Sequence, residues 1–426
     1  MEDSIDACEL VAKVLTSFLT VDQDISHDQI IHNAEFLLSP PTMSVLRVNT
    51  LQSSPEAALT KAAAILHAQD SSFCAIPLPG MPEVLTIKAK GPLDVIPTER
   101  QAIVSVECAQ AVLRGAHVFG PGVIAIQDDA TGDSAVSVWA DLDEKCTRGF
   151  RKIYGGRKKF VGNGILKMPS KGLAIEMIQT KWKMPSFEQF PRQLYFPQNL
   201  PSILVVEELA PRPGEIVLDM CASPGGKSSH IGIKMKNTGL LISLDKNINK
   251  VNKLKDTLAQ QSVTSARAYI ADASKLLSAD GLGVSPAEYS GGTDKLLPNS
   301  FSRICLDPPC SGFGQRPLIP ASSYSPNLRG YASYQMKMVS TACALLKSGG
   351  CMSYSTCTMV PDENEQVVAY AVQELGMQLE TPRFGYGSPG LSGFGLSDSE
   401  CEKVKRFWPA GLEDTIGFFY AVLKKP

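Results

Sequence analysis

The chain has 426 residues, which exceeds the length of most single hydrophobic cores, so two or three domains are expected. Its formal net charge is only −2, no apolar run approaches the roughly 18–20 residues of a membrane span, and its acidic first residues do not resemble a secretory signal. These properties argue against a membrane or secreted protein and predict a cytoplasmic one, whose cysteines are reduced.

The first 90 residues predict a small α+β region. A helical pattern at the start is followed by an extended segment around residues 39–50, and then by an Ala-rich helix over residues 55–67. We therefore expect residues 1–90 to form the first structural unit of the chain.

Residues 91–183 change to short β-like runs broken by Gly and Pro, with a strand expected over residues 136–140 and a helix over residues 99–113. Between residues 145 and 183 there are eleven Lys or Arg and a single acid, Glu176. Such a stretch could neutralise several phosphates of a nucleic acid, and a solvated surface is the alternative interpretation. A compact β-rich domain is expected here.

Apolar strands alternate with helical patterns in residues 184–426, mainly from residue 211 onward. Strands are expected over residues 216–219, 240–245, 268–272, 304–307, 352–355 and 417–423. A helix over residues 331–347 should end at the glycines at 349 and 350. This alternation predicts an α/β domain with a parallel doubly wound sheet. Two stretches rich in Gly, Ser and Pro, residues 278–300 and 385–398, are expected to be mobile loops beside the sheet.

The turn after the first of these strands is a candidate cofactor site. It has the sequence Cys221-Ala222-Ser223-Pro224-Gly225-Gly226-Lys227. Ligands of such sheets bind at the carboxyl ends of the strands, and paired glycines let the backbone approach a ligand closely. Neither a G-x-G-x-x-G loop nor a Walker A loop is present, which disfavours a dinucleotide or a nucleoside triphosphate.

Acids follow the next strands of the predicted sheet. Asp245 suits the hydroxyls of a ribose, Asp272 suits an adenine amino group, and Asp307 ends the fourth strand. Each acid alone would more often be a capping residue. Three acids at successive strand ends favour a cofactor that contains a nucleoside.

Two cysteines leave neighbouring strands at the same edge of the sheet. The fourth strand runs into Asp307-Pro308-Pro309-Cys310-Ser311-Gly312, and the fifth into Tyr354-Ser355-Thr356-Cys357-Thr358. A buried cysteine is usually a packing residue, but these two lie among small and polar residues where a thiolate could be exposed. A thiolate that adds to carbon 6 of cytosine would make carbon 5 nucleophilic, and Asp307 with a second thiol could handle the protons.

These motifs, together with residues 415–419 (TIGFF), resemble the Nop/Sun (Fmu-type) RNA 5-methylcytosine methyltransferases over residues 192–426. The segment at residues 46–50 (LRVNT) is similar to the N-terminal RNA-facing motif of that family. The resemblance implies a Rossmann-like domain that binds S-adenosyl-L-methionine through residues 221–227, Asp245, Asp272 and Asp307. The family often has Asp-Ala-Pro-Cys and Cys-Ala-Ala-Pro-Gly-Gly-Lys, and Pro308 and Ser223 depart from these without removing a functional side chain.

The same resemblance implies the roles of four side chains. Cys357 would form the covalent bond to the base, and Cys310 would assist proton removal or product release. Asp307 would contact the cytosine, and Lys227 would line the pocket near the methionine end of the cofactor.

Residues 111–123 (AVLRGAHVFGPGV) resemble a PUA RNA-binding domain, here inserted between the N-terminal region and the catalytic domain. This order of domains resembles the PUA-containing tRNA methyltransferases of the family, which implies a monomer that acts near the 3′ end of tRNA. The residues expected to meet RNA are Arg114, Phe119, Lys145, Arg148, Lys158, Lys159 and Asn163. For Phe119, packing in the core of the domain is an equal alternative.

Several alternatives remain open at this point. A base N-methyltransferase would use Asp307-Pro308-Pro309 with a following aromatic residue, but Cys310 stands there, and Cys357 would have no role. Ribosomal or messenger RNA would keep the chemistry with another substrate, and a noncatalytic RNA-binding protein would not need the two cysteines. No metal site is expected, because no Cys-x-x-Cys pair is present and the five histidines are not spaced from cysteines as zinc ligands are.

Overall fold

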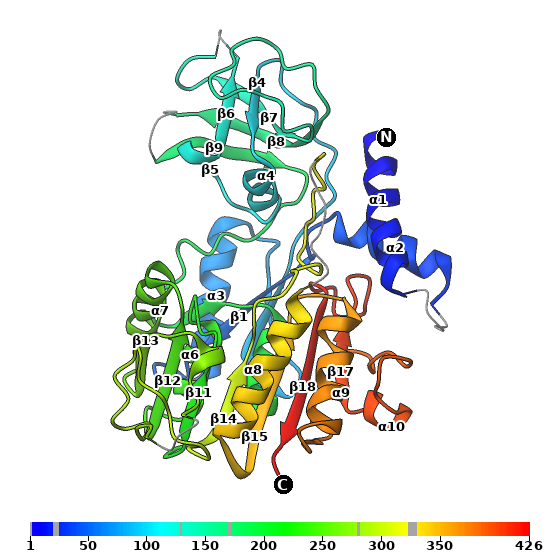
Figure 1. The fold of residues 1–426 in the computed structure, drawn as a ribbon. Helices are drawn as coiled ribbons and strands as arrows, with labels where there is room; N and C mark the ends of the chain where they lie inside the picture. Colours follow the sequence, from blue (N-terminus) through cyan, green and yellow to red (C-terminus); the bar gives the residue numbers. More distant parts are fainter. Residues whose placement is uncertain (1, 20–24, 128–129, 168–171, 279–281, 323–329) are drawn as a thin grey trace.

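A computed structural model describes residues 2–19, 25–127, 130–167, 172–278, 282–322 and 330–426. Three β-sheets organise these residues. The six-stranded sheet lies apart from the rest at the top of the view, while the other two sheets form the larger body below it (Figure 1). No helix among these residues is long and apolar enough to cross a membrane.

Two N-terminal helices, α1 (Glu2–Leu19) and α2 (His27–Leu37), pack together beside the larger body. Ser26 caps α2 by accepting a hydrogen bond from the backbone N–H of Gln29, and the side-chain oxygen of Gln29 accepts one from the backbone N–H of Ser26. The apolar faces of both helices share a buried cluster with Phe313 and Met359. These helices therefore support the two loops that follow Cys310 and Cys357.

A four-stranded antiparallel sheet has the order β10-β1-β3-β2. Its elements are β1 (Met43–Val48), β2 (Ala75–Leu78), β3 (Met81–Lys88) and β10 (Tyr195–Pro197), with α3 (Pro55–Gln69) packed on it. The sheet thus combines residues before and after the six-stranded unit.

In the segment at residues 46–50, Leu46 to Asn49 are buried and only Thr50 is exposed. Arg47 is 1% exposed and donates to Ser229 Oγ at 2.8 Å and to Gln198 Oε1 at 3.0 Å. Asn49 is fully buried and donates to two backbone carbonyls, of Gln193 and of Gln261. Both side chains therefore connect the four-stranded sheet to the part of the chain that contains the eight-stranded sheet and its helices.

The six-stranded sheet has the order β5-β9-β8-β7-β4-β6. It comprises β4 (Gln101–Val104), α4 (Val106–Leu113), β5 (Val118–Phe119), η1 (Gly120–Gly122), β6 (Val123–Ile126), β7 (Ala135–Asp141), β8 (Lys158–Leu166) and β9 (Leu173–Thr180). The helix expected over residues 99–113 is wrong in its first half, because residues 101–104 pair with β6 and β7. Ser105 then caps α4, accepting from the backbone of Cys108.

The eight-stranded sheet has the order β13-β12-β11-β14-β15-β18-β16, with β17 paired to β18. Its strands are β11 (Ile216–Asp219), β12 (Leu240–Asp245), β13 (Ala266–Ile270), β14 (Phe301–Leu306), β15 (Leu346–Thr356), β16 (Gln378–Leu379), β17 (Val404–Phe407) and β18 (Phe418–Lys424). The five strands β11, β12, β13, β14 and β15 pair in parallel with their neighbours in this group, whereas β16, β17 and β18 pair antiparallel. The expected all-parallel sheet is therefore mixed.

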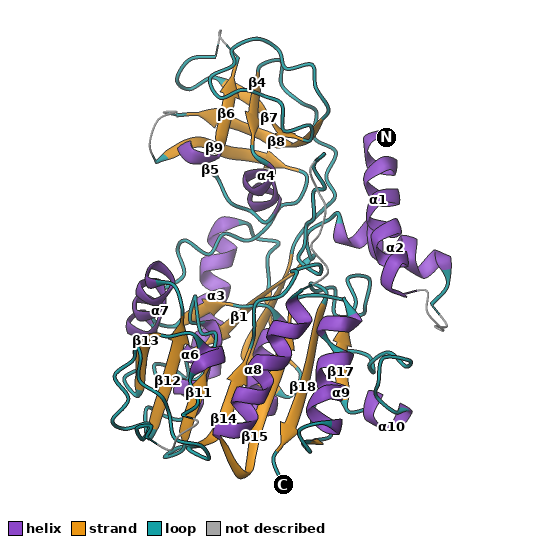
Figure 2. Cartoon of the chain, viewed as in Figure 1, coloured by secondary structure: helices purple, strands orange, loops and turns teal. Residues whose placement is uncertain are grey.

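Helices cover both faces of this sheet (Figure 2). They are α5 (Leu200–Leu209), α6 (Gly226–Lys234), α7 (Ile248–Gln260), η2 (Ala273–Lys275), α8 (Tyr331–Leu345), η3 (Pro361–Glu363), α9 (Glu365–Gln373) and α10 (Asp398–Cys401). α5 and α6 pack on one face, and α8 and α9 on the other, as a doubly wound fold requires. α8 ends at Leu345, earlier than expected, because β15 already includes Gly349 and Gly350.

The two stretches expected as loops are mostly irregular. Residues 279–281 lie outside the described part of the chain, and the described residues around them form isolated bridges, such as that of Val284 with Leu296. In residues 385–398, Ser388 bridges to Arg406, and Asp398 already begins α10.

Candidate active site

The glycine turn after β11 is held between two neighbouring elements. Gly225 has a φ of +110°, and a Cβ built on it would lie 2.8 Å from the side chain of Thr257 on α7. A Cβ on Gly226 would lie 3.1 Å from the ring of Phe196 on β10. Only glycine fits at position 225, so the turn at residues 221–227 keeps its backbone close to the carboxyl edge of the sheet.

The acids expected to hold the cofactor follow neighbouring strands. Asp245 ends β12, is buried and accepts from the backbone N–H of Asn247 at 3.1 Å. Asp272 lies two residues beyond the end of β13 rather than within it, and it caps η2 by accepting from Ser274. Burial would raise the pKa of Asp272, but its bonds from Ser274 outweigh burial and lower that pKa.

A further acid, Asp219, lies at the centre of this edge. It is 1% exposed and accepts from Ser228 Oγ at 2.7 Å. Its other carboxylate oxygen has no hydrogen-bond partner among the described residues. Burial raises its pKa to about 6. An unpartnered buried acceptor beside the glycine turn fits a ligand that brings its own hydrogen-bond donor, as S-adenosylmethionine would.

Asp307 and Lys227 form an ion pair next to the turn. Lys227 Nζ lies 2.7 Å from Asp307 Oδ2, and Ser355 Oγ donates to Asp307 Oδ1 at 2.8 Å. Lys227 also lies over the ring of Phe418, 5.6 Å from its centroid. Burial alone would lower the pKa of Lys227, but the carboxylate of Asp307 outweighs it, so the net pKa is raised. The pairing with Asp307 therefore favours the charged form of Lys227.

Cys310 and Cys357 lie together, with their sulfur atoms 3.4 Å apart. Ser311 follows Cys310 and Thr358 follows Cys357, and their hydroxyl oxygens lie 2.8 Å apart. This hydrogen bond is a second contact between the two loops. Both cysteines are half-buried. The expectation that the two cysteines meet at one edge of the sheet is confirmed.

Both cysteine loops are anchored by buried polar groups. Glu363 accepts from the backbone N–H of Ser311 at 2.9 Å and from Gln335 at 3.0 Å. Gln335 also donates to the carbonyl of Pro309. A fully buried carboxylate thus fixes the backbone beside Cys310.

The two thiols have opposite tendencies to ionise. The hydrogen bond from Cys310 lowers the pKa of Cys357 from its ordinary value, against the raising effect of burial. The same bond, together with burial, raises the pKa of Cys310. Cys357 is therefore the more acidic thiol of the pair, and Cys310 holds its proton more firmly.

A groove with a volume of about 470 Å³ opens beside these groups. Among the residues that line it are Cys221, Ala222, Ser223, Pro224, Gly226, Lys227 and Asp307. Arg114 from the end of α4 and Gln315 from the loop after Cys310 also line it. The groove therefore brings the predicted cofactor turn and the acid–lysine pair together with one of the predicted RNA residues.

The other predicted RNA residues lie on the six-stranded sheet unit. Phe119 is 51% exposed, so the core-packing alternative for it is wrong, and Lys145 and Arg148 are exposed too. Arg148 donates to the carbonyls of Val123 and Pro121. These three side chains are accessible to a ligand.

Three of the predicted RNA residues are less available. Lys158 donates to Gln101 at 2.9 Å and to the carbonyl of Tyr154, and burial lowers the pKa of Lys159 to about 8. Asn163 is 2% exposed and bonds to Ile96, Gln179 and Thr98 within the sheet unit. Both amide hydrogens of Asn163 and one bond to its oxygen are thus used within the sheet unit, so the side chain has a structural role.

Four residues of the site received no role from the sequence: Asp219, Gln315, Ser355 and Phe418. Asp219 ends β11 and Ser355 is the last residue but one of β15, so their position at strand ends could have identified them. Gln315 lies in a loop and Phe418 begins β18, and no local sequence pattern places either of them at the site. Among the described residues, no group of three or more His, Cys, Asp or Glu could hold a metal ion.

Comparison with known proteins finds relatives along most of the chain. A family model described as 16S rRNA methyltransferase RsmB/F matches residues 206–424. The tRNA (cytosine(72)-C(5))-methyltransferase NSUN6 of Mus musculus is 37% identical over 388 residues, covering 88% of this chain and 80% of the relative. The tRNA (cytosine(72)-C(5))-methyltransferase of Pyrococcus horikoshii is 30% identical, with 91% of each chain covered. The crystal structure of NSun6 from Pyrococcus horikoshii with SFG matches with a TM-score of 0.77, at 27% identity and 97% coverage of both chains.

Proposed function

The chain belongs to the RsmB/F family of S-adenosylmethionine-dependent RNA cytosine-5 methyltransferases, and from this premise we propose that it methylates cytosine 72 in the acceptor stem of tRNA. The family resemblance drawn from the sequence motifs is confirmed. The relatives with that named activity match the chain over most of their own length, including the part before residue 206. An rRNA (cytosine-C(5))-methyltransferase of Arabidopsis thaliana covers a similar share of the chain at 29% identity, so the higher identity of the mouse tRNA methyltransferase, 37%, is what supports tRNA over ribosomal RNA as the substrate.

The proposed reaction begins with the Cys357 thiolate. It adds to carbon 6 of the cytosine, and the electron pair of the 5,6 double bond moves toward the ring nitrogen and makes carbon 5 nucleophilic. S-adenosylmethionine supplies the methyl group that carbon 5 receives. Removal of the proton from carbon 5 then restores the double bond and expels the sulfur of Cys357.

The remaining side chains of the site contact the base, transfer protons and hold the cofactor. Asp307, whose Oδ2 lies 2.7 Å from Lys227 Nζ, is placed to accept from the amino edge of the cytosine. Cys310, 3.4 Å from Cys357, is placed to give its proton to the leaving thiolate, and it takes the proton from carbon 5 only when it is itself deprotonated. Residues 221–227, Asp245 and Asp272 would hold the cofactor, and Asp219 would accept from it.

We assign the six-stranded unit, residues 91–183, as the PUA domain of this arrangement. Residues 1–90 are the N-terminal region, and residues 184–426 are the catalytic domain. The position of Arg114 on the catalytic groove supports a joint RNA surface, because it brings the six-stranded unit next to Lys227 and Asp307. Both thiols and all the acids come from one chain, so a monomer is sufficient.

The observation that carries the proposal is the pair of sulfur atoms 3.4 Å apart beside the Asp307–Lys227 pair. A Cys310→Ala variant incubated with tRNA and S-adenosylmethionine should accumulate a covalent protein–RNA adduct, since release of Cys357 is impaired. Cys357→Ala should form no adduct and no 5-methylcytosine. Denaturing gel electrophoresis separates the two outcomes.

Two controls make the result decisive. Cys74→Ala removes an exposed cysteine outside the site and should behave as the unmodified protein. A tRNA with uracil at position 72 should receive no methyl group at that site. Equal behaviour of the two site variants would overturn the assigned roles, and methylation at another position would overturn the proposed target.

A further inference from the structure

Gln315 lies at the wall of the catalytic groove, close to the backbone of Cys357. Its side chain is exposed and lines the groove together with Lys227 and Asp307. Gly314 packs against Cys357, because a Cβ built on Gly314 would lie 2.8 Å from the carbonyl oxygen of Cys357. A larger residue at position 314 would push this loop away from Cys357. The loop therefore brings Gln315 within reach of the sulfur that attacks the base.

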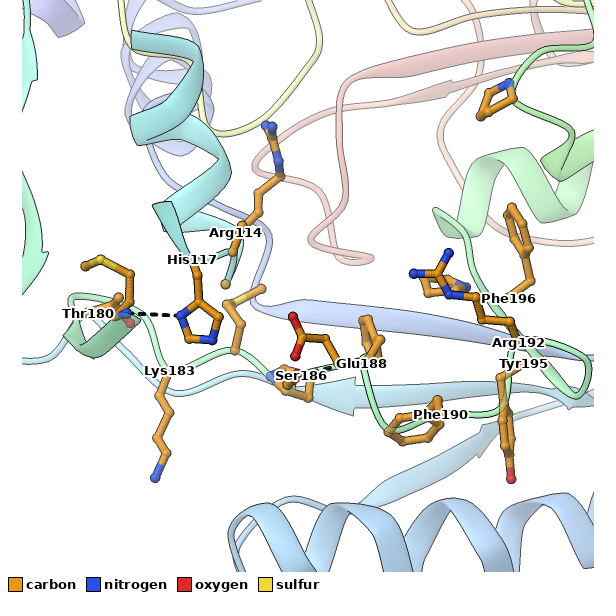
Figure 3. A pocket seen from close by; sticks show the side chains of 18 of the residues that line it. Arg114, His117, Thr180, Lys183, Ser186, Glu188, Phe190, Arg192, Tyr195 and Phe196 are labelled. Atoms are coloured by element: carbon orange, nitrogen blue, oxygen red, sulfur yellow. Dashed lines mark hydrogen bonds between the residues drawn. The ribbon is translucent and has the colours of Figure 1, made fainter. Parts of the chain in front are cut away.

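Arg316 anchors the backbone next to Gln315. It is 1% exposed, and its guanidinium donates to four backbone carbonyls at 2.8–3.2 Å. Its own carbonyl accepts from Nη1 of Arg114 at 3.4 Å. In Figure 3 the side chain of Arg114 extends from the end of α4 and points away from His117. Contacts from the larger body and from the six-stranded unit thus fix the backbone that carries Gln315.

Two hydrogen bonds lower the pKa of Cys357 against the raising effect of burial. The bond with Cys310 has the largest effect, and the bond with the side chain of Gln315 lowers the pKa further. An amide that favours the charged form of a thiol does so by donating its N–H to the sulfur. The carboxamide of Gln315 is therefore a hydrogen-bond donor to the sulfur of Cys357.

The two donors differ in whether they change during the reaction. Cys310 is placed to give its proton to the leaving thiolate, so it stops being a donor once in each cycle. The carboxamide of Gln315 does not titrate, so it can donate to the sulfur in every protonation state of the site. A base bound in the groove would also exclude water from this hydrogen bond, which strengthens a bond to a charged group.

We propose that Gln315 is a further catalytic residue, whose carboxamide donates a hydrogen bond to the sulfur of Cys357 and keeps that sulfur charged until it attacks carbon 6. The inference rests on the function proposed above and adds a residue to its mechanism. When the sulfur–carbon bond forms, the negative charge moves from the sulfur to the ring. When that bond breaks, the electron pair returns to the sulfur beside the same donor.

The first test is the pH dependence of the alkylation of Cys357 by iodoacetamide, in the full chain without RNA. Gln315→Ala removes the donor, so the midpoint should rise by about one to two pH units, as expected for a hydrogen bond to a charged group. Gln315→Glu keeps the size of the side chain but places a carboxylate beside the sulfur, so its midpoint should rise at least as far. Peptide mass spectrometry follows Cys357, with the exposed Cys74 as internal reference. A role of Gln315 in packing alone would leave Gln315→Glu like the unmodified protein.

The second test is the single-turnover rate of methyl transfer to saturating tRNA at several pH values. Below both midpoints, Gln315→Ala should be about three- to tenfold slower, because the loss of thiolate is only partly offset by the higher nucleophilicity of a less stabilised sulfur. Above both midpoints, the variant should be as fast as the unmodified protein or faster. The Kd for S-adenosylmethionine should not change. A deficit that stays constant across the pH range would show that the substitution displaces the loop, and the inference would be wrong.

Gln378→Ala is the matched control, since Gln378 is an exposed glutamine of β16 outside the groove, and it should keep both pH profiles. The outcomes separate this inference from the proposed function. If the unmodified protein methylates tRNA but the profiles of Gln315→Ala match those of Gln378→Ala, only the role of Gln315 fails. If the unmodified protein does not methylate tRNA at all, the proposed function fails, and the catalytic role of Gln315 fails with it, whatever the alkylation shows.

Discussion

The sulfur atoms of Cys310 and Cys357 lie 3.4 Å apart, and their surroundings favour ionisation of one thiol over the other. The hydrogen bond with Cys310 is the largest effect that lowers the pKa of Cys357, and Gln315 and Lys227 lower it further. A single ionised thiol beside a protonated one is the arrangement that covalent catalysis needs, because one group attacks while the other supplies a proton.

This division predicts the pH dependence of alkylation at Cys357. Since the pKa of Cys357 is lowered, its reaction with iodoacetamide should reach half its maximal rate below the pH of about 8.5 that is usual for a thiol. In Cys310→Ala the stabilising hydrogen bond is lost, so the midpoint should move to higher pH. Peptide mass spectrometry measures the rates, with the exposed Cys74 as internal reference. An identical midpoint in both proteins would contradict this account.

Sequence reasoning located the reactive residues better than the supporting ones. Cys357, Cys310 and Asp307 follow strands, and a strand end at the carboxyl edge of the sheet fixes their position. Arg47 and Asn163 are polar residues whose partners lie far along the chain, such as Ser229 for Arg47. Their burial depends on tertiary contacts that no local pattern contains, so the sequence did not predict the structural role of either residue.

At the scale of elements, the strands that end in acids were the most predictable. β11 and β12 have the expected bounds, because an apolar run that stops at an acid marks both the strand and its end. The start of β4 was missed because Ala102-Ile103-Val104 can continue a helix as well as form a strand. The β-branched Ile103 and Val104, followed by Ser105 as a helix cap, were the features that could have indicated a strand before the helix. The direction of β18 depends on its partner β15 and is not encoded locally.

Arg406 connects β17, α9 and the loop after Cys357. It is fully buried, bonds to both oxygens of Glu365 and donates to the carbonyl of Met359 at 2.7 Å. Arg406→Ala should lower the free energy of unfolding by about 3–5 kcal/mol, since it removes the cation that pairs with the buried Glu365 and leaves that carboxylate only the backbone N–H of Leu391. Urea denaturation measures this, and the exposed Glu402→Ala should stay within about 0.5 kcal/mol. A small effect of Arg406→Ala would mean that Glu365 becomes neutral.

A buried histidine between α5 and α6 predicts part of the acid sensitivity. His230 is 2% exposed, and its Nε2 lies 3.0 Å from Glu207. Burial lowers its pKa from 6.5 to about 4. Because the folded-state pKa is below the unfolded one, the stability contribution is present above pH 6.5 and is lost as the pH falls toward 4.

The His230→Gln variant tests this linkage, because glutamine can still donate to Glu207 but does not titrate. Between pH 6.5 and 4 the unmodified protein should lose up to about 3 kcal/mol more than the variant, as the shift in pKa implies. Urea denaturation at several pH values gives the two curves. Parallel curves would show that His230 is not the titrating group.

At the scale of the whole molecule, RNA binding by the six-stranded unit should depend unequally on its lysines. Lys145 is exposed, whereas Lys158 already donates within the protein and lies over the ring of Trp139. Lys145→Ala should reduce the slope of log K against log salt by about 0.7–0.9 if it meets one phosphate. Lys158→Ala should change the slope less. Fluorescence anisotropy across a salt series measures both, and a larger effect of Lys158 would contradict the geometry.

Lys90 and Lys183 stand where the chain leaves the four-stranded sheet and where it comes back. Their backbones bond to each other in both directions, at 3.0 Å and 2.8 Å, and both ammonium groups meet Asp70. The whole unit between them is therefore an insertion whose two ends are joined by an antiparallel bridge. An insertion whose ends already pair can be lengthened, shortened or exchanged with little disturbance of the sheets on either side. Evolution could thus replace the module that selects the RNA while the chemistry of the larger body stays as it is.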